Sequence, residues 1–332
     1  MKIGKVIFLV LSGLALSVSF AVEAKLADFA HFPPIPAKST PARTLDFPTG
    51  AKFGGIAWQD RADYDFDEEA HVVNKNAIGT IKVPANKFVG YFPNHVFIQN
   101  PHALDKLPPD SFDYLQFRYI VLHDEDEGRG DPALASLGRF TSIRILDADK
   151  AEIGDRGLEC LSRLPNLQFV TLFSTGAEGK FLKNFASAKQ IVGLNFANTQ
   201  LKPIYLDTLK TFPKLYFVNL GRLHLKSTDL CKMGVMPSLG FLDISSNPDL
   251  DDSCVPYLMT SMPKLLRLDI RKTGISKAGV KKLQSKYPKV VTSYVQGDMQ
   301  RATRSSGNRA RNSVRENEIE TIFGPMSRGR GL

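Results

Sequence analysis

The chain has 332 residues, of which 43% are hydrophobic, and its formal net charge is +9 at pH 7. This proportion of apolar residues is that of a globular protein and excludes a chain that is disordered throughout. The three cysteines are an odd number and widely spaced, which excludes a framework of disulfides.

The first 24 residues have the parts of a secretory signal peptide. Lys2 and Lys5 provide a positive start, and residues 6–20 are apolar apart from Ser and Gly. Val22 and Ala24 then form a small-residue cleavage site. The apolar run is too short for a typical membrane span, although an uncleaved N-terminal anchor is the alternative. We therefore expect a secreted or periplasmic protein whose mature chain contains no transmembrane span.

Two segments are expected between the signal peptide and the centre of the chain. Residues 25–78 are rich in Pro, Phe, Asp and Lys, and we interpret them as a Pro-rich linker and irregular segment. Residues 79–138 are expected to form an N-terminal flank or cap, with strands at residues 78–83 and 88–91. A cap is needed because an open solenoid end must be covered.

Residues 139–296 contain the strongest pattern, a repeat of the form Pro-x-Leu-x-x-Leu-x-Leu. Its first apolar positions fall at residues 143, 167, 191, 215, 239 and 265, in steps of 24, 24, 24, 24 and 26. A short strand of this pattern buries one face only, so parallel copies must stack to form a continuous core. A period in the twenties with this spacing is typical of leucine-rich repeats. The sequence predicts an α/β solenoid with a parallel concave sheet.

Short helices are expected between the strands, on the convex side. Residues 155–163, 227–233, 253–259 and 277–286 carry apolar residues at helical spacing. Proline follows most of these segments and ends the helix before the next strand. In leucine-rich repeats, an Asn after each strand usually bonds the backbone of the turn. Asn247 occupies this position in its repeat. Threonines replace it in other copies, and Leu223 interrupts the series.

Two segments of the sequence resemble those of a known protein family. Residues 153–167 read IGDRGLECLSRLPNL, and residues 79–87 read GTIKVPANK ahead of LPPD at residues 107–110. The chain resembles bacterial secreted leucine-rich repeat proteins with ribonuclease-inhibitor-like or cysteine-containing repeats, over roughly residues 79–295. The resemblance implies a solenoid fold and a role in recognition, because this family has no common ligand.

The end of the chain differs in composition from the repeats. Residues 297–332 are dominated by Arg, Ser, Asn and Gly, with seven arginines against four acidic residues. Such a composition predicts a disordered basic tail. An Arg-rich segment of this kind could hold the protein to a polyanion, such as lipid headgroups, an anionic glycan or nucleic acid. Such binding would weaken steeply with salt.

No pattern in the sequence names a reaction, and we expect neither an enzyme nor a cofactor. The acidic stretch at residues 123–131, between His123 and Asp131, is interpreted as a solvated loop rather than a calcium site, since its spacing matches no known loop. The cysteines are interpreted as buried free thiols, with a bridge between Cys231 and Cys254 as the alternative.

The candidate binding site lies on the concave face, where the third, fifth and seventh residues of each repeat point away from the core. These columns combine aromatic with short polar side chains, as protein-binding surfaces do. The alternative is that the aromatic rings pack on one another or on the N-terminal flank. The predicted site residues are Phe169, Thr171, Phe173, Asn195, Phe217, Asn219, Phe241, Asp243, Arg267, Asp269 and Arg271.

These expectations define one main function and one alternative. The main hypothesis is an extracytoplasmic module that binds a protein of unknown identity through its concave face. The alternative is an envelope-associated protein whose Arg-rich tail binds polyanions. No metal site is expected in either case.

Overall fold

A computed structural model describes residues 39–60, 73–118, 128–185, 187 and 189–292. The predicted signal peptide, the basic tail and residues 123–127 of the acidic stretch lie outside these residues. The chain divides into two compact units, Met1–Val290 and Val291–Leu332. The description that follows concerns the first unit, with the last strand of its sheet ending at Val291.

One long sheet organises this unit. It has eleven strands in the order β13-β12-β11-β10-β9-β8-β7-β6-β5-β2-β3, and neighbouring strands from β5 to β12 are parallel. The strands of the sheet are β2 (Gly54–Gln59), β3 (Val73–Asn76), β5 (Phe88–Pro93), β6 (Tyr114–Gln116), β7 (Ile145–Asp147), β8 (Phe169–Thr171), β9 (Gly193–Asn195), β10 (Phe217–Asn219), β11 (Phe241–Asp243), β12 (Arg267–Asp269) and β13 (Lys289–Val291).

The strand register confirms the leucine-rich repeat solenoid. Val218 of β10 lies opposite Leu194 of β9 and Leu242 of β11, which are each 24 residues away. The same pairing, one repeat to the next, joins Leu146 to Val170 and Leu242 to Leu268. Each copy of the sequence pattern therefore adds one strand to the sheet.

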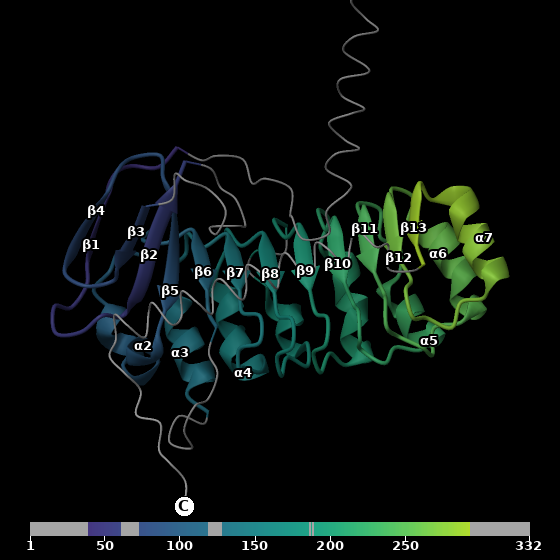
Figure 1. Ribbon diagram of the computed structural model, residues 1–332, viewed down its shortest axis with the longest axis horizontal. Coiled ribbons are helices and arrows are strands. Elements are labelled where there is room, and N and C mark those ends of the chain that lie inside the picture. Colours follow the sequence, from purple (N-terminus) through teal and green to yellow (C-terminus); the bar gives the residue numbers. More distant parts are fainter. Residues whose placement is uncertain (1–38, 61–72, 119–127, 186, 188, 293–332) are drawn as a thin grey trace, which may run out of the picture. The chain divides into compact units, whose positions relative to one another are not determined.

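Short helical segments connect the strands and lie together on one side of the sheet (Figure 1). Several are 3-10 helices, since a repeat of 24 residues leaves room for only one or two turns. Their bounds are α2 (His95–Gln99), η1 (Pro101–Leu104), α3 (Gly130–Leu137), α4 (Asp155–Leu158), η3 (Glu159–Arg163), η4 (Lys180–Asn184), η5 (Pro203–Thr211), α5 (Ser227–Leu230), η6 (Cys231–Met233), η7 (Asp252–Cys254), α6 (Val255–Ser261) and α7 (Lys277–Lys286).

The main core fills the space between the sheet and these helical segments. The middle residue of each repeat strand, such as Val170, is fully buried there together with helical residues such as Leu158 and Leu161. We call the opposite side of the sheet, which carries the third, fifth and seventh residues of each repeat, the concave face. A separate cluster of buried residues, which includes Ile145 and Phe169, lies on that side.

The N-terminal part is more regular than the sequence suggested. Residues 25–78 were expected to be irregular, yet their described part holds three strands, β1 (Arg43–Asp46), β2 and β3. β1 pairs with β4 (Thr80–Val83) in a separate two-stranded sheet, and β2 pairs antiparallel with β5 at the edge of the long sheet. Stacked rings of Tyr91 and Phe112, with centroids 4.7 Å apart, fill the core beneath them. These strands are too short for their alternation to stand out from a Pro-rich background.

A residue in the left-handed backbone region follows each repeat strand, three residues after its end. The eighth residue of all six repeats has φ between 55° and 63°, although none of them is glycine. A non-glycine residue at such an angle is strained, so the hydrogen bonds around it must hold the turn. The six residues are Lys150, Ser174, Asn198, Arg222, Ser246 and Lys272.

Asn247 holds the turns of two repeats. Its Oδ1 accepts hydrogen bonds from the backbone N–H groups of Leu223 and Leu225, at 3.0 and 3.1 Å, in the repeat where Leu223 interrupts the polar series. Its Nδ2 donates to the carbonyls of Leu220 and Ile244, at 2.9 and 3.0 Å. The asparagine therefore supplies the bonds that its neighbouring repeat lacks.

The threonines that replace this asparagine bond only within their own repeat. Thr175 and Thr199 each donate to the carbonyl three residues back and accept weakly from the N–H two residues ahead. The threonine side chain is too short to bond the preceding repeat as Asn247 does. Each threonine therefore satisfies fewer backbone groups than Asn247.

We expect Asn247→Ala to be the most destabilising single change in the polar series. It would leave two backbone N–H groups and two carbonyls without their buried partner, at a cost on the order of 3 kcal/mol. Thr199→Ala should cost about 1 kcal/mol, because fewer bonds are lost. Urea unfolding of both variants measures the difference. Equal losses in the two variants would show that Asn247 does not bridge two repeats.

Candidate functional site

The structure brings the predicted site residues together in two columns on the concave face. In the third column, Phe169, Phe217 and Phe241 lie on β8, β10 and β11, and Gly193 on β9 separates the first ring from the second. The fifth column continues without a gap from one strand to the next. Its members are Gln116, Asp147, Thr171, Asn195, Asn219, Asp243 and Asp269.

The aromatic residues of the third column are buried, which agrees with the alternative that their rings pack against other parts of the protein. Phe169, Phe217 and Phe241 are 2%, 8% and 8% exposed. Phe169 packs in the cluster that includes Phe88 of β5 and Tyr114 of β6, so the N-terminal strands cover it. The ring of Phe241 meets Tyr216 edge to face, with centroids 5.3 Å apart. Aromatic rings on a sheet commonly pack on neighbouring side chains, and Phe169 and Phe241 do so here.

Four of the eleven predicted residues remain partly exposed, and seven are buried. The buried set also contains Thr171, Asp243, Arg267 and Asp269. The partly exposed residues are Phe173, Asn195, Asn219 and Arg271.

The short polar residues of the fifth column hold the strand ends. The side-chain Oδ1 of Asn219 accepts a hydrogen bond from the N–H two residues ahead, at 2.9 Å. The same bond is made by Asp147, Asn195, Asp243 and Asp269, at 2.8–3.1 Å. This is the Asx-turn, which Asn and Asp favour because their oxygen reaches the backbone two residues on. The sequence carried the signal, an Asx residue in five of six copies, but its structural role was missed.

Thr171 is the exception in this column. The backbone N–H two residues after it bonds a carboxylate of the preceding repeat instead. The N–H of Phe173, two residues after Thr171, donates to Oδ1 of Asp149 in the preceding repeat, at 2.9 Å. The hydroxyl of Thr171 donates to the same oxygen. Asp149 is therefore held next to Asp147 in a largely buried place.

Two pairs of carboxylates result on the concave face. Burial, followed by repulsion from Asp147, raises the pKa of Asp149 to about 6. Burial, followed by repulsion from Asp269, likewise raises the pKa of Asp243 to about 6. These carboxyl groups change charge in a range where ordinary aspartates stay ionised.

Arginines partly compensate both pairs. At the N-terminal end, Nη2 of Arg118 lies 2.8 Å from Oδ2 of Asp147, which also accepts from Gln116. At the C-terminal end, Nε of Arg271 donates to Oδ1 of Asp269 at 2.9 Å. Nη2 of Arg271 lies 2.6 Å from Oδ2 of Asp269 without hydrogen-bond geometry, so that contact is an ion pair only.

The described residues contain no group of three or more His, Cys, Asp or Glu side chains that could hold a metal ion. Of the acidic stretch, Asp131 is described, and its Oδ1 accepts from the N–H of Gly154 at 2.8 Å. Cys160 and Cys254 are buried free thiols, and Cys231 is an exposed free thiol, so Cys231 and Cys254 are not bridged. In the part of the chain that the structure describes, no helix has the length and apolar character to cross a membrane.

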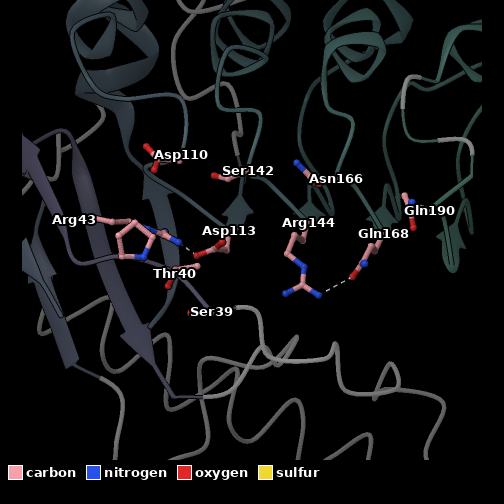
Figure 2. A pocket seen from close by; sticks show the side chains of 11 residues that line it. Ser39, Thr40, Arg43, Asp110, Asp113, Ser142, Arg144, Asn166, Gln168 and Gln190 are labelled. Atoms are coloured by element: carbon pink, nitrogen blue, oxygen red, sulfur yellow. Dashed lines mark hydrogen bonds and ion pairs between the residues drawn. The ribbon is translucent and has the colours of Figure 1, made fainter. Parts of the chain in front are cut away.

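A second candidate site, which sequence reasoning missed, lies where strands β6, β7 and β8 begin. It is a pocket of about 500 Å³. Figure 2 shows polar side chains from several repeats lining it. No sequence signal identifies it, because β1 contributes one wall from far along the chain. Its charged and amide lining residues include Arg43, Asp110, Asp113, Arg144, Gln168 and Gln190.

No family model and no curated protein matches the chain. Among solved structures, it is similar to Toll of Drosophila in a complex with Spatzle, with a TM-score of 0.43, 12% identity, and coverage of 69% of this chain and 34% of that one. It is also similar to TLR13 in a complex with ssRNA13, with a TM-score of 0.36 and 15% identity over 59% of this chain and 34% of that one. Internalin C2 of Listeria monocytogenes gives a TM-score of 0.34 and 14% identity, over 59% of this chain and 84% of that one.

The chain thus spans about a third of the Toll and TLR13 chains that it matches. Its assignment to the leucine-rich repeat fold stands on the repeat spacing and on the strand register.

The raised carboxyl pKa values predict how stability depends on pH. The pKa of each carboxyl group is about 6 in the folded state and near 3.8 in the unfolded state. Such a group contributes its full stabilisation below pH 3.8, where it is protonated in both states. This stabilisation is lost as pH rises through about 6. Asp149→Asn and Asp243→Asn keep the acceptor oxygen but cannot ionise. Each variant should gain stability over the wild type between pH 4 and 7.5, by on the order of 2 kcal/mol at the upper end.

Urea unfolding at a series of pH values measures this gain. A gain that is the same at pH 4 and pH 7.5 would show that the two carboxyl groups do not titrate in this range.

Proposed function

We propose that this protein is an extracytoplasmic leucine-rich repeat module that binds a protein partner through the concave face of its sheet. The observation that carries the proposal is the sheet itself. Seven parallel strands, from β6 to β12, stand side by side with the helical segments on the other side (Figure 1). Solenoids use such extended faces to bind other macromolecules.

The partly exposed side chains of this face have the chemistry of a protein-binding surface. Asn195 and Asn219 are neighbours in register on β9 and β10. The Nδ2 amide of Asn219 has no hydrogen-bond partner among the described residues, so it is available to a ligand. Phe173 adds a half-buried ring beyond the end of β8. Aromatic anchors beside amide donors are common at interfaces.

The extracytoplasmic location rests on the sequence. Lys2, Lys5 and the apolar stretch at residues 6–20 precede small residues at positions 22 and 24, as in a secretory signal peptide. The proposed role is recognition of a protein ligand without catalysis, in keeping with the absence of any catalytic sequence motif.

The Arg-rich tail supports the alternative function, binding to a polyanion of the envelope. The two functions differ in their dependence on salt and on residues 297–332. Attraction between the tail and a polyanion falls as ionic strength rises. Contacts made by Phe173 and the asparagine amides should be much less sensitive.

A photo-crosslinking experiment tests the concave face. We would replace Phe173 by p-benzoylphenylalanine in the full-length protein and expect a covalent adduct with the partner after irradiation in the native host. Ile204 and Val235, which are 66% and 62% exposed, provide matched positions away from the concave face. The same replacement at these positions should trap the partner at least tenfold less. Mass spectrometry of the adducts identifies the partner.

Deletion of residues 297–332 separates the two functions in this experiment. The adduct at position 173 should persist in the deletion variant and at high salt. Loss of every adduct on deletion would favour the polyanion function. Adducts formed only at positions 204 or 235 would contradict binding through the concave face.

A further inference from the structure

The pocket at the start of strands β6 to β8 is a built polar site that is distinct from the concave face. Arg144 and Gln168 immediately precede β7 and β8, and Arg43 comes from β1 of the small N-terminal sheet (Figure 2). Its volume of about 500 Å³ falls within the usual range of ligand pockets.

Arg43 is fixed in this pocket by one of its nitrogens. Its Nη1 donates to Oδ2 of Asp113 at 2.7 Å and to the carbonyl of Ser111 at 3.2 Å. The side chains of Arg43 and Asp113 are only 6% and 8% exposed. Asp113 is held in turn by the backbone N–H of Val89, at 3.0 Å. The guanidinium therefore cannot change orientation without breaking a buried ion pair.

The other edge of this guanidinium is available. A guanidinium has five N–H donors, and the two on Nη1 are occupied. Among the described residues, none accepts a hydrogen bond from Nε or Nη2 of Arg43. Nε–H and the adjacent Nη2–H are parallel and match the two oxygens of a planar anion. Because the group is already fixed, little rotamer entropy is lost when a ligand binds.

Further donors line the same pocket, at the starts of the later strands (Figure 2). Arg144 is 8% exposed and donates to Oε1 of Gln168 at 3.1 Å, which leaves the Nε2 amide of Gln168 without a partner among the described residues. Oε1 of Gln190 likewise accepts from Lys214, at 2.9 Å. Burial lowers the pKa of Arg144 even though Asp113 opposes that change.

We propose that this pocket binds a carboxylate group, held by Nε and Nη2 of Arg43, in a cavity that Gln168 and Gln190 also line. A carboxylate fits better than a phosphate dianion because Asp110 and Asp113 also line the pocket and balance the two arginines. The carboxylate can belong to an acidic side chain of a polypeptide or to a free organic acid.

Titration of the full-length protein at constant ionic strength tests the proposal. The probes are acetate, the peptide acetyl-Gly-Glu-Gly-amide, its Gln counterpart and inorganic phosphate, followed by saturation-transfer NMR and calorimetry. Acetate and the Glu peptide should bind at least tenfold more tightly than the Gln peptide and phosphate. A Glu peptide that binds tenfold more tightly than acetate indicates a polypeptide ligand, and equal binding indicates a free acid.

Two variants and a control locate the binding. Arg43→Lys keeps a positive charge beside Asp113 but loses the paired donors, and should weaken binding of the Glu peptide at least tenfold. Gln168→Glu adds a negative charge at a partly exposed position and should also weaken binding of the Glu peptide at least tenfold. This variant keeps the test valid if Arg43→Lys fails to fold. Arg156→Gln, at an exposed position of α4, is the charge-matched control and should bind as the wild type does.

Three results would overturn the proposal. They are no measurable binding of either carboxylate probe, binding of phosphate in preference to both, and unchanged binding by the two pocket variants.

Discussion

The structure depends on how each repeat satisfies its backbone polar groups where its strand ends. The chain must turn there every 24 residues, through a strained left-handed residue that is never glycine. Unpaired backbone groups in such a buried turn would be costly. Asx side chains, threonine hydroxyls and Asn247 provide the partners. Where one repeat lacks its own polar residue, a neighbour supplies the bond, as Asn247 does for Leu223 and Asp149 does for Phe173.

This constraint explains why the concave face carries so many short polar residues. A column of Asn and Asp resembles a ligand-binding surface in the sequence, but most of its oxygens are occupied by the turns. Stacking at strand spacing also brings carboxylates such as Asp243 and Asp269 side by side in a buried place. Their mutual repulsion follows from the architecture. What remains for a partner is the set of partly exposed amides and rings beside the column.

The N-terminal flank contributes more than a cover for the open end of the core. Strands β2 and β5 extend the sheet and bury the aromatic residue of β8 on the concave side. Strand β1 carries Arg43 to the start of β6 and β7, where its ion pair with Asp113 joins the cap to the first repeats. One side chain thereby contributes to both the stability of the cap and the chemistry of the pocket.

The sequence by itself determined the repeat, its period, the strand positions and the face to which each strand residue points. These follow from local spacing, since one apolar face per strand can be buried only by stacking. Tertiary structure alone decided how exposed Phe169 is, because its cover comes from Phe88 and Tyr114, on strands far from it in the sequence. It also decided the pocket, because Arg43 reaches Asp113 only through the pairing of β1 with β4, a contact that no local pattern encodes.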